Sequence, residues 1–155
     1  MTPLFKKLNL GAFTTVHVLN APSSFEPELQ ALSGVSIQRS AASTVGFAMA
    51  FVTTLAQVEQ ATQQLAAHAV GDATLWMVYP KASSRKFKCE FNRDNGWDSL
   101  GAAGYEPVRQ VAIDDDWSAL RFRKAAYIKT MKRHPAGAIS SEGKVKVEQQ
   151  RGHSD

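Results

Sequence analysis

Hydrophobic residues recur in short runs along the first 124 positions, and polar, proline- or glycine-containing stretches separate these runs. Runs of this length with no clean polar side are typical of strands buried on both faces, as in the parallel sheets of α/β proteins. The predicted strands cover residues 14–20, 35–39, 45–52, 74–79, 107–113 and 118–123.

Helices are predicted in several of the intervals between these strands. The clearest covers residues 55–69, where apolar side chains form one stripe behind the capping pair Thr54 and Gln57, and Gly71 follows the last turn. Ser23 and Glu26 have capping-box spacing before a second helix. The predicted helices cover residues 4–8, 26–32, 55–69, 95–103 and 125–134.

The alternation of these elements predicts a three-layer Rossmann-like α/β sandwich, with a mostly parallel sheet and a C-terminal antiparallel hairpin. A short acidic segment joins residues 107–113 to 118–123, so this last pair of strands must be antiparallel. We expect residues 1–124 to form the domain, residues 125–134 a basic helix packed on it, and residues 135–155 a flexible polar tail.

The closing segment Gly101-Ala-Ala-Gly-Tyr-Glu-Pro-Val-Arg-Gln-Val111, together with the order of elements, resembles the fold of class I S-adenosylmethionine-dependent methyltransferases. Such folds place a glycine-rich turn after the first strand, because the backbone must approach the ligand closely. Here residues 19–29 contain no glycine and two prolines, Pro22 and Pro27. We therefore predict no cofactor.

Two further blocks of sequence resemble an uncharacterised family of bacterial proteins. One is Trp76-Met-Val-Tyr-Pro-Lys81, and the other is Asp115-Asp-Trp-Ser-Ala-Leu-Arg-Phe122 with its preceding aspartate. The resemblance covers most of the chain. It implies a fold and boundaries, and it names no reaction.

The net charge of +4 is concentrated near the C-terminus, since residues 1–123 contain 11 Lys and Arg against 11 Asp and Glu. Residues 1–123 carry no net charge, which does not favour nucleic acid as the partner. Binding of nucleic acid through the C-terminal cations Lys129, Lys132 and Arg133 is the alternative. The single cysteine, and the lack of a signal sequence or of an apolar run of membrane-spanning length, predict a cytoplasmic protein without a membrane partner.

Lys81 follows a strand and its terminating proline, and in open parallel sheets ligands bind beyond the carboxyl ends of the strands. A lysine with orienting hydroxyl and amide groups suits a phosphate or a carboxylate. The alternative is that Lys81 is solvated and the serines cap loop backbone. The candidate ligand-binding residues are Asn20, Ser23, Ser24, Thr53, Lys81, Ser83 and Ser84.

The acidic tripeptide at residues 114–116 is interpreted as the turn of the closing hairpin, because aspartates favour turns. Only Asp114 and Asp116 could point the same way, which makes them weak candidates for a site. Trp117 would anchor the hairpin, and Arg121 and Arg123 would pair with the acids. We predict no metal site.

These observations favour a non-catalytic or degenerate Rossmann-like binding or regulatory domain. The first alternative is a small enzyme that acts on an anionic ligand at the carboxyl edge of the sheet. The second is a nucleic-acid accessory protein that uses the basic tail.

Overall fold

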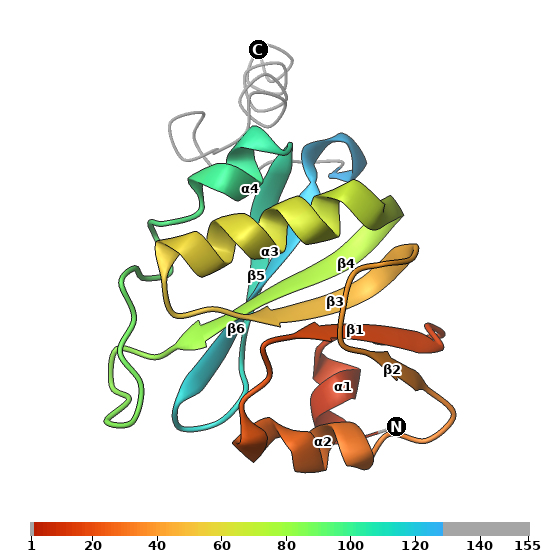
Figure 1. Ribbon diagram of the computed structural model, residues 1–155, viewed down its shortest axis with the longest axis horizontal. Helices are drawn as coiled ribbons and strands as arrows, with labels where there is room; N and C mark the ends of the chain where they lie inside the picture. The colour runs from red at the N-terminus through yellow and green to blue at the C-terminus, as the bar shows by residue number, and fades with distance from the viewer. Residues whose placement is uncertain (1, 129–155) are drawn as a thin grey trace, which may run out of the picture.

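In the computed structural model, which describes residues 2–128, six strands form one sheet in the order β2-β1-β3-β4-β6-β5 (Figure 1). The strands are β1 (Thr15–Leu19), β2 (Ser36–Gln38), β3 (Val45–Phe51), β4 (Ala69–Pro80), β5 (Tyr105–Ala112) and β6 (Trp117–Lys124).

The four strands β2, β1, β3 and β4 run parallel to one another, as predicted. β6 is antiparallel to both of its neighbours and lies between β4 and β5. The predicted antiparallel hairpin is therefore confirmed, and its second strand is the one that joins the parallel sheet. The mixed, mostly parallel α/β fold is confirmed with it.

Helices cover both faces of the sheet. On one face lie α3 (Leu55–His68) and α4 (Asp98–Ala102), and on the other lie α1 (Pro3–Lys7) and the turn of η1 (Ser23–Phe25) with α2 (Glu26–Gln30) (Figure 1). Each face has its own hydrophobic cluster. Side chains alternate along β4, so Leu75, Met77 and Tyr79 pack under α3 while Trp76 and Val78 pack under α1.

The predicted capping pair begins α3. Thr54 Oγ1 accepts a hydrogen bond from the backbone N–H of Gln57 at 3.1 Å, and Gln57 Oε1 accepts one from the backbone N–H of Thr54 at 3.3 Å. Gln57 Oε1 also accepts from the N–H of Thr53 at 2.7 Å, which satisfies a further donor at this helix end. Thr53 and Thr54 therefore take part in capping the N-terminus of α3.

Some element boundaries differ from the prediction. β4 begins at Ala69, directly after α3, so Gly71 lies inside an extended segment at φ 56° and does not end the helix. The helix expected at residues 95–103 begins at Asp98, because Gly96 at φ 89° belongs to the preceding turn. Residues 86–91 form no strand, and Phe87 packs with the α1 face whereas Phe91 packs with the α3 face.

After β6 the chain makes a single short turn, η2 (Ala125–Tyr127). Most of the predicted basic helix, all of the predicted polar tail and the alternative nucleic-acid residues Lys129, Lys132 and Arg133 lie outside the described residues. Among residues 2–128, no helix is both long enough and apolar enough to span a membrane.

Candidate functional site

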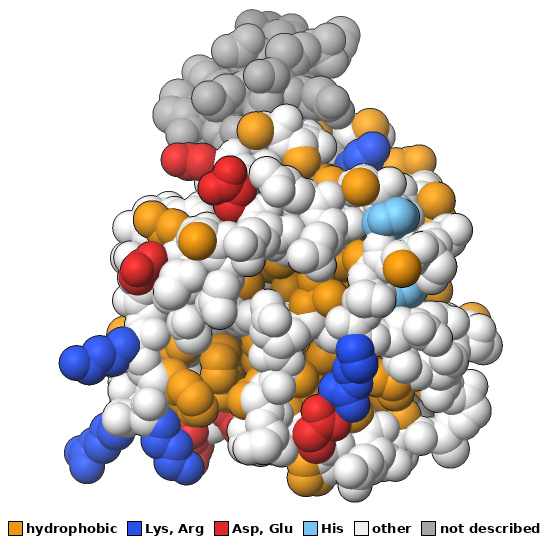
Figure 2. Space-filling model, in the orientation of Figure 1, with side chains coloured by type: hydrophobic (Ala, Val, Ile, Leu, Met, Phe, Trp, Pro, Cys, Tyr) orange, Lys and Arg blue, Asp and Glu red, His pale blue; other side chains and the backbone are white. Residues whose placement is uncertain are grey.

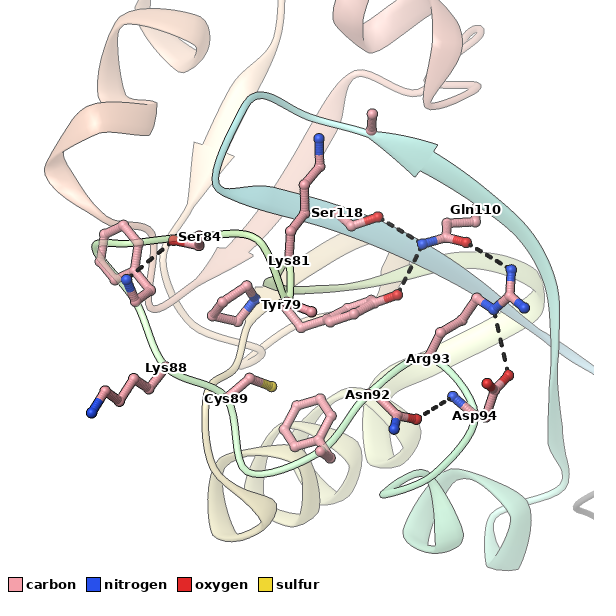
Figure 3. Close-up of a pocket in the computed structure, with 15 residues that line it drawn as sticks. Tyr79, Lys81, Ser84, Lys88, Cys89, Asn92, Arg93, Asp94, Gln110 and Ser118 are labelled. Atoms are coloured by element: carbon pink, nitrogen blue, oxygen red, sulfur yellow. Dashed lines mark hydrogen bonds and ion pairs between the residues drawn. The ribbon is translucent and has the colours of Figure 1, made fainter.

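A pocket of about 1080 Å³ opens at the carboxyl end of β4, under the long connection between β4 and α4 (Figure 3). Its lining residues come from β4, from the connection at residues 81–94, from β5 and from β6. They are Tyr79, Pro80, Lys81, Ala82, Ser84, Phe87, Lys88, Cys89, Phe91, Asn92, Arg93, Asp94, Gln110, Ala112 and Ser118.

The floor of the pocket is a polar network carried by three strands. Gln110 Nε2 donates to the Tyr79 hydroxyl at 3.0 Å and to Ser118 Oγ at 2.9 Å, and Gln110 Oε1 accepts from Arg93 Nη1 at 3.3 Å (Figure 3). Burial raises the pKa of Tyr79, against a smaller lowering from its hydrogen bond with Ser118. The Tyr79 phenol therefore stays protonated at neutral pH and can donate a hydrogen bond to a ligand.

A compact turn places Arg93 above this floor. Asn92 Oδ1 accepts from the N–H of Asp94 at 2.8 Å, and Asn95 Oδ1 accepts from the N–H of Asn92 at 3.0 Å. The indole of Trp97, which is only 3% exposed, donates to the carbonyl oxygen of Arg93 at 2.9 Å. The backbone of Arg93 is thereby tied to the core under α3, while its side chain reaches Gln110.

The connection that forms the pocket wall is itself fastened to the start of α3. The N–H of Glu90 donates to the carbonyl oxygen of Thr53 at 3.1 Å, and Glu90 Oε2 accepts from the N–H of Leu55 at 2.9 Å. A carboxylate near a helix N-terminus is favourable because the free amides and the helix dipole are positive there. These contacts close the connection over the carboxyl end of β3.

Positive charge predominates around the pocket. The connection at residues 81–94 carries five cations and two carboxylates, and Lys and Arg side chains gather at the corresponding lower left of the molecule in Figure 2. Three of these cations, Lys81, Lys88 and Arg93, line the pocket. Arg93 also forms an exposed ion pair with Asp94 at 3.4 Å, which contributes little stability at such exposure.

One wall of the pocket is apolar and carries the only cysteine of the chain. Phe87 and Phe91 flank Cys89 in sequence, and all three residues line the pocket. Burial raises the pKa of the Cys89 thiol, so the neutral thiol predominates at neutral pH. Such a thiol is a weak nucleophile and serves here as part of the wall.

The acidic tripeptide forms the hairpin turn, as predicted. Asp114 Oδ1 accepts from the N–H groups of Asp116 and Trp117, both at 2.8 Å, and Asp116 Oδ1 accepts from the hydroxyl of Ser84 at 2.9 Å. Trp117 is buried and packs against Phe51. Residues 2–128 contain no group of three or more His, Cys, Asp or Glu side chains placed to hold a metal ion.

The predicted ion pairs between this turn and the following arginines are wrong. Arg123 pairs with Asp72 at 2.6 Å, and Arg121 reaches Thr74. Both arginines lie toward the far end of β6, so the aspartates of the turn are out of their reach.

The predicted ligand-binding residues are not gathered at one rim. Lys81 and Ser84 line the pocket, whereas the other candidates do not. Those others are Asn20, Ser23, Ser24, Thr53 and Ser83. The pocket lies at the end of β4 on the side of β5 and β6, away from β1.

The turn after β1 differs from a glycine-rich nucleotide turn. Asn20 adopts φ 60°, and Pro22, which lacks an N–H group, precedes η1. Nearby, Arg39 at the end of β2 forms two hydrogen bonds with the Glu26 carboxylate, at 2.8 and 2.7 Å. The residues of this turn do not fit the glycine cradle of a Rossmann fold.

No protein-family model and no curated protein matches the chain. Similar solved structures include N-methyltransferase NodS from Bradyrhizobium japonicum WM9, with 15% identity over 78% of this chain and 92% of NodS and a TM-score of 0.48. The same enzyme in complex with S-adenosyl-l-homocysteine has 14% identity over 79% of this chain and 88% of NodS, with a TM-score of 0.49.

These comparisons correct two predictions. We predicted a non-catalytic binding or regulatory domain and no cofactor, whereas the similar structures are those of a methyltransferase, one of them with S-adenosyl-l-homocysteine bound. Both predictions are withdrawn. At this identity and TM-score the likeness concerns the fold, and it assigns neither a reaction nor a cofactor to this chain.

Proposed function

We propose that this protein is an enzyme that acts on a small molecule with a phosphate or carboxylate group, bound in the pocket between the connection at residues 81–94 and the strands β4, β5 and β6. The observation that supports this most is the position of Arg93. Its guanidinium donates a hydrogen bond to Gln110 Oε1 and lines the pocket. The lysines and arginines that line this pocket outnumber its carboxylates. A guanidinium matches the geometry of both oxyanions.

The lining offers separate places for the two ends of such a ligand. Arg93 and Lys81 supply charge for the anionic group, and the protonated Tyr79 hydroxyl supplies a hydrogen bond. Phe87 and Phe91 provide apolar surface for the body of the ligand. Apolar walls with a few convergent polar groups are typical of small-molecule sites.

Methyl transfer from S-adenosylmethionine is the first reaction to assay, because this is the activity named for the similar structures. The turn after β1 lacks the glycine cradle, so its residues do not fit this cofactor as a Rossmann turn does. The assignments to the uncharacterised bacterial family and to the cytoplasm remain proposals. A nucleic-acid role through Lys129, Lys132 and Arg133 also remains a proposal, on residues outside those described.

Isothermal titration calorimetry with a panel of phosphorylated and carboxylated metabolites, and with S-adenosylmethionine, tests the proposal. We expect Arg93→Gln to weaken binding of an anionic ligand by about tenfold or more, because a charge-assisted hydrogen bond is lost. Arg85→Gln is the matched control: it removes the same charge from the same connection, and Arg85 does not line the pocket.

A second measurement reports on occupancy without relying on calorimetry. A bound ligand should slow alkylation of Cys89, because this thiol lines the pocket and is the only one in the chain. Equal losses of affinity in both arginine variants, or alkylation that no ligand of the panel slows, would refute the proposed site.

A further inference from the structure

A second group of cations lies on the other face of the sheet, near the opposite end of β6 from the pocket. Arg121 and Arg123 alternate with the buried residues Leu120 and Phe122, which pack under α3, so the arginines face the α1 side. Arg109 on β5 stands directly opposite Arg121 in the strand register. Three guanidinium groups from two adjacent strands therefore share one face.

Their charge is only partly compensated among the described residues. Arg123 engages both oxygens of the Asp72 carboxylate, through Nε at 2.9 and 3.0 Å and through Nη2 at 2.6 Å. The buried side chain of Glu106 stands opposite Arg123 in the strand register. Arg109 and Arg121 are left facing each other across the strands. Like charges directly opposite in a sheet destabilise it, so this arrangement is costly without an anion.

Arg121 also has unused hydrogen-bonding capacity. Its Nε is buried and has no hydrogen-bond partner within residues 2–128, and its Nη2 makes a long 3.4 Å contact with Thr74 Oγ1. Burial, followed by the positive charge of Arg123, lowers the pKa of Arg121 from its usual value. The guanidinium still carries its charge at neutral pH, because an arginine titrates far above it.

We propose that Arg109, Arg121 and Arg123 form a binding site for a phosphate group, separate from the pocket and on the opposite face of the sheet. A phosphate that bridges Arg109 and Arg121 would replace their mutual repulsion with two charge-assisted contacts. The inference goes beyond the proposed function and does not depend on it. The phosphate could belong to a small molecule or to a nucleic-acid backbone, and the experiment separates these two sources.

Pyrophosphate and a short single-stranded oligonucleotide are titrated into the full chain at fixed ionic strength. Arg109→Gln and Arg121→Gln should each weaken pyrophosphate binding by about tenfold or more. Lys7→Gln, which removes an exposed cation from α1 on the same side of the sheet, should leave affinity within about twofold. If the wild type binds the oligonucleotide and the same variants lose this binding, the phosphate belongs to a nucleic-acid backbone. If the wild type binds pyrophosphate but not the oligonucleotide, the phosphate belongs to a small molecule.

Thermal denaturation gives a second, independent measurement of phosphate binding at these arginines. Without ligand, Arg109→Gln should melt at the same temperature as the wild type or higher, since a repulsion is removed. With pyrophosphate, the wild type should gain melting temperature and this variant should not. The inference would be overturned if the wild type did not bind pyrophosphate. It would also be overturned if Arg93→Gln abolished this binding while Arg109→Gln and Arg121→Gln left it unchanged, because the anion would then bind in the pocket.

Discussion

The indole of Trp97 donates a hydrogen bond to the carbonyl oxygen of Arg93 at 2.9 Å, so a core side chain holds the backbone of the residue that faces the pocket. Trp97 packs against Phe91, Phe122 and Tyr79. Packing under α3 is thereby coupled to the position of the guanidinium at the pocket.

Trp97→Phe should lower the free energy of unfolding by about 1 kcal/mol more than Trp117→Phe. Both residues are buried, but the indole nitrogen of Trp117 has no hydrogen-bond partner within residues 2–128, so its replacement loses no such bond. Urea denaturation of the two variants gives the comparison. Equal losses would show that the bond to Arg93 adds no net stability.

Gly96→Ala should destabilise the protein by about 2 kcal/mol or more, because two separate costs coincide. Gly96 has φ 89°, and a β-carbon there would lie 2.5 Å from the β-carbon of Phe91, which cannot rotate away. Gly34→Ala is the control, since Gly34 also has a positive φ, 68°, but open space around it. Chemical denaturation should show a loss of only about 1 kcal/mol in the control; a similar loss in both variants would rule out the steric cost.

The Glu26–Arg39 pair should make stability depend on pH. The hydrogen bond from Arg39 lowers the pKa of Glu26 below its ordinary 4.5, so its contribution is present above that value and is lost as pH falls through the lowered pKa. Wild type should therefore melt above Glu26→Gln at pH 7, and the difference should vanish in strong acid. A difference that persists at about pH 2 would show that charge is not its source.

Cys89 should react slowly with iodoacetamide at neutral pH, since burial raises the pKa of its thiol and only the thiolate attacks. The rate should keep rising with pH above 9.0, the ordinary value for a thiol. Urea-unfolded protein, alkylated in parallel, serves as the reference and should react faster at pH 7. Equal rates in the two states would show that burial does not protect the thiol.

Local patterns were sufficient to predict much of the fold. The apolar runs around Val18, Met49 and Met77 predicted buried strands, and Thr54 with Gln57 predicted the start of α3. These features depend on neighbours a few positions away in the sequence, which periodicity and capping rules describe.

The site was less predictable because it depends on contacts between distant segments. Gln110 meets Tyr79 and Ser118 only because β6 lies between β4 and β5 with a particular register. Arg93 reaches Gln110 only because Trp97 and Glu90 fasten the connection to α3 and the core. The polar residues Gln110 and Ser118 inside otherwise strand-like segments were the available signal.

The insertion of β6 between β4 and β5 affects how the protein is made. A ribosome releases β4 and β5 before Trp117–Lys124. Until β6 emerges, β4 can pair with β3 along one edge only, and β5 has no strand to pair with. Unpaired strand edges are templates for aggregation, so the nascent chain is vulnerable between the release of β5 and the release of β6. A chain that stalls before residue 117 would leave β5 without any docking partner in the sheet.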